Sequence, residues 1–235
     1  MINRVLPSIA IQNIDLEKCY FNPGCAASIY KPELPELMLE FLRGRFGSVK
    51  LHNICCRHDP CLPEGATIIN NCAGCDRRFH SEYAGIQTIT YWEILDTLKD
   101  LKLPDHTGLT VSVHDSCSFR QKPQVHAAVR SILRKMNIQI IESEFSGTNS
   151  ICCGDTFYSH IPDEKVAAFQ RWRAAQMPCD DVVVYCIGCV RSMTVGRKNA
   201  HYLADLLFDR KTEPINNTLS EYHGDLDAYI KKHCV

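Results

Sequence analysis

Residues 181–189 read DVVVYCIGC, a short apolar run followed directly by two cysteines three positions apart. The run Asp181–Tyr185 is rich in β-branched residues and predicts a buried strand. Cys186 and Cys189 follow at the point where this strand ends. The segment therefore predicts a pair of thiols at the carboxyl end of a strand.

Two earlier segments repeat this arrangement. Leu109–His114 alternates as a strand does and is followed by Cys117. Ile138–Ile141 predicts another strand, and Cys152-Cys153 lies in the long loop beyond it. Each cysteine group thus follows a predicted strand.

Helices are predicted between these strands. Residues 122–136 have an apolar face with helical spacing, and residues 163–177 begin with two acidic side chains, which are favourable near the positive end of a helix. Alternating strands and helices predict a parallel sheet, and ligands bind at the carboxyl edge of such sheets. The cysteine groups are therefore expected to converge on one site.

The same order of cysteines occurs twice along the chain. The first set is Cys25, Cys55, Cys56, Cys72 and Cys75, and the second set is Cys117, Cys152, Cys153, Cys186 and Cys189. An internal repeat of this kind indicates a duplicated structural unit. We predict an α/β protein with two tandem, pseudo-symmetric repeats, 1–104 and 105–210, each a small Rossmann-like parallel sheet with helices, followed by a tail at 211–235.

The first repeat is shorter than the second. Between the adjacent cysteine pair and the Cys-x-x-Cys motif lie 32 residues in the second set but only 15 in the first. The difference nearly equals the helix predicted at 163–177, so the first repeat is expected to lack that crossover helix. The apolar sheet face around Ile68 then needs a cover, which the tail, a second copy of the chain or a partner could provide.

Fourteen cysteines in 235 residues are a high proportion for a chain of this length. Neighbouring thiols converge well on a metal and seldom form disulfides with each other, so their pairing favours metal binding over disulfides. Zinc takes four ligands, whereas five convergent thiols suit an iron–sulfur cluster.

Several classes of function fit poorly. The net charge of −1 argues against a protein that grips nucleic acid, and no apolar run approaches the 18 residues of a membrane span. The N-terminus does not resemble a signal peptide, so a cytoplasmic protein is expected. Neither a dinucleotide fingerprint nor a P-loop occurs, so electrons are expected to come from a partner.

Three motifs carry a resemblance to a known family: YFNPGC at 20–25, HDSC at 114–117 and CCG at 152–154. They resemble the cysteine-rich CCG domains of the heterodisulfide reductase B subunit and of related iron–sulfur subunits in glycolate and lactate oxidation. The resemblance spans roughly residues 18–208. It implies that each cysteine set holds a non-cubane [4Fe-4S] cluster, one or two per chain, and that facing clusters cleave a disulfide in one-electron steps.

The first set departs from the family pattern. Arg57 stands where the glycine of the CCG motif is expected, and the loop after it is short. An ordinary cluster or zinc is therefore possible in the first site, with Cys61 as a substitute ligand. Cys19 and Cys179 are expected to be buried thiols outside both sets.

The resemblance predicts an iron–sulfur redox protein that transfers electrons or reduces a disulfide or another small substrate. A flavoprotein or iron–sulfur subunit would donate the electrons, and a homodimer is also possible. His114, His58 and Asp155 are candidates to position the substrate or supply protons. Two alternatives stay open: a zinc-binding structural or interaction module without redox activity, and a metal-free thiol–disulfide switch.

Overall fold

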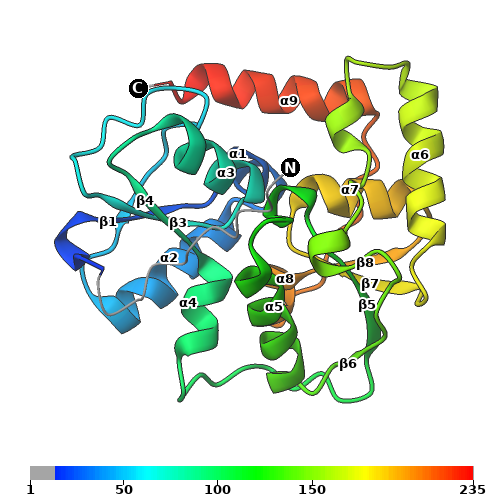
Figure 1. Ribbon diagram of the computed structural model, residues 1–235, viewed down its shortest axis with the longest axis horizontal. Coiled ribbons are helices and arrows are strands. Elements are labelled where there is room, and N and C mark those ends of the chain that lie inside the picture. Colours follow the sequence, from blue (N-terminus) through cyan, green and yellow to red (C-terminus); the bar gives the residue numbers. More distant parts are fainter. Residues whose placement is uncertain (1–13, 235) are drawn as a thin grey trace.

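The computed structural model describes residues 14–234 and contains two four-stranded parallel sheets. The strand orders are β2-β1-β3-β4 and β6-β5-β7-β8, so the second sheet repeats the order of the first. Figure 1 shows the two sheets in neighbouring halves of the molecule, with helix α9 running past both. The predicted α/β class, with its two tandem parallel sheets, is confirmed.

In its described residues, the first half contains four strands and four α-helices. The strands are β1 (Cys19–Asn22), β2 (Lys50–Leu51), β3 (Thr67–Asn70) and β4 (Gln87–Thr90). The helices are α1 (Cys25–Tyr30), α2 (Glu33–Phe46), α3 (Ala73–Glu82) and α4 (Tyr91–Thr97), and a short 3₁₀ helix spans Leu16–Lys18.

The second half has the same order of strands. They are β5 (Thr110–His114), β6 (Gln139–Ile140), β7 (Asp181–Val184) and β8 (Asn199–Tyr202). The helices are α5 (Pro123–Lys135), α6 (Asp163–Ala175), α7 (Ile187–Val195) and α8 (Leu203–Leu207), with 3₁₀ turns at Cys117–Phe119, Gly147–Asn149 and Asp155–Phe157. The tail forms α9 (Leu219–Lys232).

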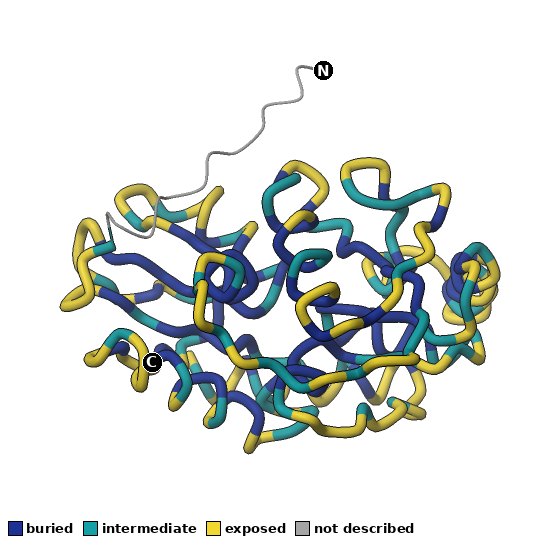
Figure 2. Tube along the Cα trace, turned by 90° about the horizontal axis from the view of Figure 1, so that it is seen from below, coloured by how far each residue is buried: buried dark blue, intermediate teal, exposed yellow. Residues whose placement is uncertain are grey.

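The central strands are buried on both faces, as Figure 2 shows. Val182, Val183 and Val184 of β7 are fully inaccessible to solvent, which explains why this strand is a continuous apolar run rather than an alternating one. One hydrophobic core includes side chains from both halves, with α4 of the first half packed against α5 of the second. The two halves therefore share a core.

The connections between strands differ between the halves. Helix α6 lies between β6 and β7, whereas residues 52–66, between β2 and β3, are all described by the structure and contain no helix. In the first half, the side chain of Ile230 from α9 packs into a cluster with Ile68 and Phe79. Helix α9 therefore covers the side chain of Ile68 in the first half.

We predict that Ile230→Ala lowers the free energy of unfolding by about 2–3 kcal/mol, because it leaves a cavity over Ile68. Urea unfolding measures this change. Lys231→Ala, an exposed substitution one residue along the same helix, serves as the control and should change stability by less than about 0.5 kcal/mol. Equal stability of the two variants would contradict the role of α9 as a cover.

Candidate metal centre

The cysteines gather at the carboxyl edges of the two sheets. In four cases a cysteine lies two or three residues beyond the end of a strand: Cys25 after β1, Cys72 after β3, Cys117 after β5 and Cys186 after β7. Parallel pairing places the ends of neighbouring strands at the same edge. Cysteine groups that are far apart in the sequence therefore lie at the same sheet edge in the fold.

The five thiols of the second set form one connected group. Cys117 interacts with Cys152, Cys152 with Cys153, Cys153 with Cys189, and Cys189 with Cys186. Hydrogen bonds from its thiol neighbours hold the pKa of Cys152 well below its usual range. The backbone N–H of Gly154 also donates to the Cys152 sulfur at 3.3 Å. Cys152 is thus the member of the set that most readily becomes a thiolate.

The first set is connected in the same order. Cys25 interacts with Cys55, Cys55 with Cys56, Cys56 with Cys75, and Cys75 with Cys72. Interaction with Cys25 lowers the pKa of Cys55 to about 2, and interaction with Cys75 lowers the pKa of Cys72 to about 7. The first cysteine of the adjacent pair therefore has a strongly lowered pKa in both halves. The two repeats share this property as well as the order of their cysteines.

Two glycines allow the thiol-bearing loops to pack closely. Gly24 has φ +81°, and a Cβ atom there would lie 2.6 Å from the Cβ of Cys72. Gly154 has φ +102°, and a Cβ atom there would crowd Phe169 and Gln170 of α6. In the first half no helix occupies the place of α6, so the shorter loop accommodates Arg57 at the corresponding position.

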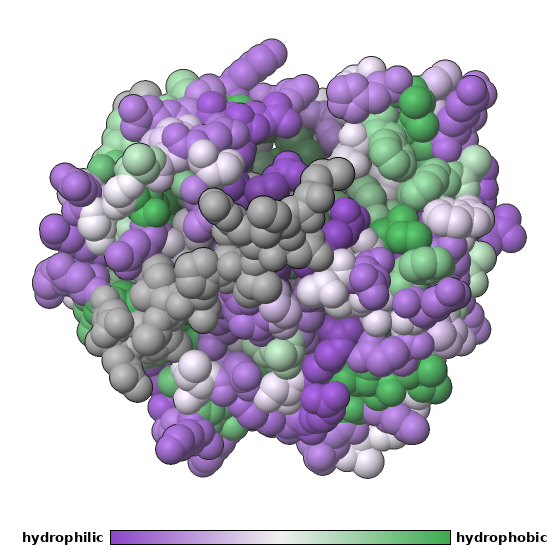
Figure 3. All heavy atoms as spheres, in the orientation of Figure 1, coloured by the Kyte–Doolittle hydropathy of each residue, from purple (hydrophilic) through white to green (hydrophobic). Residues whose placement is uncertain are grey.

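One cavity connects the two cysteine sets. It has a volume of about 460 Å³ and lies between the halves, and a recess opens on this face of the molecule in Figure 3. Its walls include all five cysteines of the second set and two of the first, Cys25 and Cys72. A much smaller recess beside it is lined by Cys25, Cys55, Cys56 and Cys75. A small molecule in the larger cavity would contact both sets.

The donor chemistry of both sets fits an iron–sulfur centre. Each set offers five sulfur donors, and thiolates are the ligands that hold such clusters. Within residues 14–234, no three histidine, cysteine, aspartate or glutamate side chains are arranged as they stand to hold a single metal ion.

Residues 111–194 match the family model described as the CCG cysteine-rich domain. This segment is a CCG domain. It runs from β5 through α7 and contains every cysteine of the second set, as the resemblance of the second repeat implied. The first set lies outside the matched residues. No curated protein matches the chain, and no helix within residues 14–234 is both long and apolar enough to cross a membrane.

The proton-donor candidates lie in different environments. Asp155, which follows the CCG motif, is in the cavity wall. His114 is fully buried, burial lowers its pKa to about 4, and neither ring nitrogen has a hydrogen-bond partner among residues 14–234. His58 lies beside the backbone carbonyl of Ile230, with its Nε2 3.2 Å from that oxygen. Of these three, only Asp155 is among the described residues that line the cavity.

A histidine of the tail, which sequence reasoning did not single out, also lines the cavity. His223 of α9 places Nε2 3.3 Å from Oδ1 of Asp155, and its ring stacks on Tyr158 with ring centroids 3.9 Å apart. A capping box of Thr218 and Glu221 fixes the start of α9. The capping-box pattern at 218–221 can be read from the sequence, but it does not reveal that His223 contacts Asp155.

The remaining cysteines are less connected. Cys19 is buried, and burial raises its pKa to about 11, as expected for a thiol in the core. Cys179 is half-buried rather than buried. Cys61 is exposed and has φ +51°. Among the described residues, the interacting thiols of the first half are the five cysteines of the first set, and Cys61 is not one of them.

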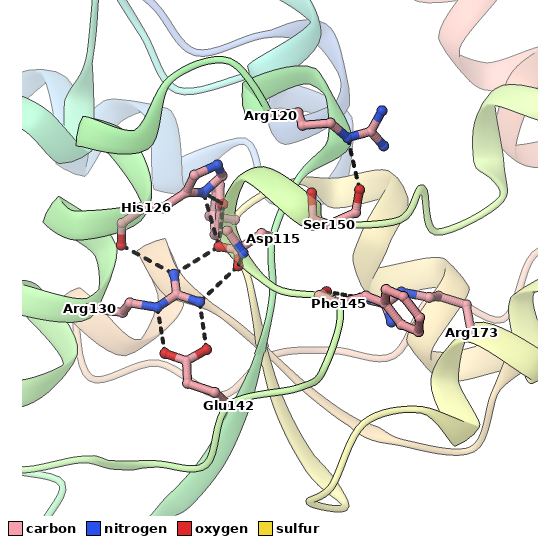
Figure 4. A network of polar contacts seen from close by, with 10 residues as sticks. Asp115, Arg120, His126, Arg130, Glu142, Phe145, Ser150 and Arg173 are labelled. Atoms are coloured by element: carbon pink, nitrogen blue, oxygen red, sulfur yellow. Dashed lines mark hydrogen bonds and ion pairs between the residues drawn. The ribbon is translucent and has the colours of Figure 1, made fainter. Parts of the chain in front are cut away.

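A buried carboxylate holds the CCG domain loops in place (Figure 4). Asp115 is fully buried, and its hydrogen-bond donors come from several segments: Arg130 on α5 at 2.8 and 3.0 Å, the hydroxyl of Tyr185 at 2.8 Å and the backbone of Gly147 at 2.6 Å. Arg130 also binds Glu142 at 2.6 Å. This network joins the ends of β5 and β7 to the loop that leads to Cys152-Cys153.

The charge of Asp115 is stabilised by its partners. Burial opposes its ionisation, but hydrogen bonds from His126 and Arg130 hold the pKa of Asp115 well below its usual range. A depressed pKa contributes stability above the ordinary carboxyl pKa of about 4, and this stability is lost as the pH falls toward the pKa of the folded state.

We predict that Asp115→Ala lowers the free energy of unfolding by about 3–5 kcal/mol at pH 7, because it leaves Arg130 buried without this partner. The deficit relative to the wild type should shrink as the pH falls below about 4. Denaturant unfolding at several pH values measures both effects. Asp180→Ala, which removes a carboxylate that is 86% exposed in its ion pair with Lys198, is the control and should cost less than about 1 kcal/mol at every pH.

Proposed function

We propose that this protein is an iron–sulfur redox protein that transfers electrons or reduces a small substrate in the cavity between its cysteine sets. The observation that carries this proposal is the cavity wall, which is formed by all five cysteines of the CCG domain and by Cys25 and Cys72 of the first set. CCG domains typically bind iron–sulfur centres in subunits of oxidoreductases related to heterodisulfide reductase.

In this proposal each repeat supplies one ligand set. Residues 105–210 hold a non-cubane [4Fe-4S] cluster on the second set, and residues 1–104 hold a second centre, which is another cluster or zinc, on the first. Helix α9 of the tail contributes Tyr222, His223 and Leu226 to the cavity wall. A cluster supplies electrons one at a time, and a flavoprotein or iron–sulfur subunit supplies them to the cluster.

A disulfide is the small substrate that this arrangement suits best. Its reduction to two thiols consumes two electrons and two protons and breaks the sulfur–sulfur bond. The cavity contains a half-buried polar pair, Asp155 and His223, beside the CCG cysteines. His223 is therefore the residue that we assign to proton delivery, with Asp155 and Tyr158 fixing its ring.

Anaerobic purification, with iron, acid-labile sulfide and zinc quantified, tests the proposed function. We expect a coloured protein with several irons and sulfides per chain. Cys153→Ser should lose the iron of the second site and keep its fold by circular dichroism. Cys179→Ser, which changes a half-buried thiol outside both sets, is the matched control and should keep its iron.

Two results would contradict the proposal. A colourless protein that contains only zinc would favour the zinc-binding module instead. Unchanged iron content and spectra in Cys153→Ser would show that this cysteine is not a ligand.

We further predict that His223→Gln leaves the iron content unchanged and slows reduction of a small disulfide by about 10²-fold, the usual contribution of a general acid. The assay uses a chemically reduced dye as the electron donor. His201→Gln is the control, because His201 lies on β8 in an ion pair with Asp181. Equal rates in the two variants would exclude His223 from proton delivery.

A further inference from the structure

A hydrogen bond between two buried side chains joins the halves of the molecule in the wall of the cavity. Nδ2 of Asn71 donates to the hydroxyl oxygen of Tyr202 at 2.8 Å. Asn71 directly precedes Cys72 of the first set, and Tyr202 is paired in the sheet with Val184, two residues before Cys186 of the second set. Both hydrogen-bonded residues are 1% exposed, and both line the cavity together with Cys72 and Cys186. The pair therefore lies in the part of the wall that the two sets share.

Tyr202 stands at a position that normally serves the start of a helix. In the first half the corresponding strand, β4, ends at Thr90, whose hydroxyl caps α4 by accepting from the backbone N–H of Glu93 at 3.1 Å. Residues with short polar side chains are favoured there because they satisfy the free N–H groups of the first turn. Tyr202 stands at the same point before α8 and makes no side-chain cap. The second repeat thus gives up a helix cap and directs this side chain to the other half.

The hydroxyl of Tyr202 has a proton that it can donate. It accepts from Asn71, whose Nδ2 also lies 3.4 Å from the carbonyl oxygen of Pro23, so the amide presents its donor side to Tyr202. A tyrosine hydroxyl can donate one hydrogen bond as well, and in the described part of the chain this one donates none. Burial raises the pKa of Tyr202 well above its usual range, and charge on Cys72 and Cys186 adds to the shift, so the hydroxyl stays protonated.

The rest of the cavity wall is polar mainly on the side of the second set. Apart from Tyr202 itself, its hydroxyl and histidine side chains come from the second half or from α9. From the first half the wall receives Asn71 and two arginines, Arg57 and Arg77, which are both exposed to solvent. Among the described residues, Tyr202 is therefore the buried hydroxyl of the wall that is fixed directly to the first half.

We propose that Tyr202 contacts the substrate and donates a hydrogen bond to the sulfur that is released on the side of the first set when a disulfide is cleaved in the cavity. This inference deepens the proposed function and rests on it. Cleavage breaks the sulfur–sulfur bond with two electrons from the iron–sulfur centre. One sulfur receives its proton from His223, and the other is released as a thiolate and takes its proton from water. Tyr202 keeps its own proton, and a donor that is already held in place stabilises the developing negative charge.

Tyr202→Phe removes the hydroxyl and keeps the ring. With hydroxyethyl disulfide as the substrate and a chemically reduced dye as the electron donor, we expect kcat to fall by about 10²-fold, with KM and iron content unchanged, because the charge develops only during cleavage. Tyr30→Phe is the matched control. Tyr30 packs on Tyr202 with ring centroids 6.1 Å apart and donates to Asp205 at 3.2 Å, but it is not among the described residues that line this cavity. Its loss should leave kcat unchanged.

Binding of the product provides a readout that does not depend on turnover. Mercaptoethanol is the thiol that reduction of hydroxyethyl disulfide releases, and calorimetry measures its affinity for the metal-loaded chain. We expect it to bind about tenfold more weakly to Tyr202→Phe than to the wild type, since a hydrogen bond to a charged sulfur is lost. Tyr30→Phe should bind it as the wild type does. Circular dichroism and iron content show that both variants are folded and loaded.

The two proposals fail in distinguishable ways. A wild-type chain that contains only zinc would overturn the proposed function. An iron-loaded chain that reduces the disulfide, with the same kcat and the same thiol affinity in the wild type and in Tyr202→Phe, would overturn the role of Tyr202 alone. Equal losses of kcat in Tyr202→Phe and Tyr30→Phe would also overturn it, because they would reflect a weakened contact between the halves.

Discussion

Parallel strand pairing is the constraint on which this structure depends. Two parallel strands cannot be joined by a tight hairpin, so the chain crosses back after each strand and every strand in a sheet ends at the same edge. Residues placed just after a strand are then gathered without needing to be close in sequence. Cys117 and Cys186 are 69 positions apart and still belong to one connected thiol group. The cysteine motifs can therefore be short and local.

The two cysteine sets have the same pattern of acidic thiols but differ in the segments that pack behind them. In each, the first cysteine of the adjacent pair is the most acidic of its set, because thiol neighbours donate to it on both sides. Behind the second set lies α6, with the buried cation Arg173. Behind the first lie a helix-free loop and the end of α9. A duplication has thus kept the donor atoms and changed the segments behind them.

Much of this arrangement follows from local sequence. The strand at 181–184 is predictable because a short run of β-branched apolar residues strongly favours a buried strand. Helix α9 is predictable from its helical spacing and capping box. β4 and β8 are not, because QTIT and NAHY are short and half polar and form strands only by pairing with β3 and β7. The Asp115 network and the His223 contact depend on tertiary packing, which no local pattern encodes.

The tail links these differences to the proposed function. Because the first repeat has no crossover helix, its sheet face near Ile68 leaves room for α9, and Ile230 fills it. Ile230 and His223 are seven residues apart on α9, which is about 10.5 Å along the helix axis. A helix anchored at Ile230 therefore brings His223 to Asp155 of the CCG domain. The shortening of one repeat therefore leaves room for the helix that lines the cavity beside the cysteines of the other.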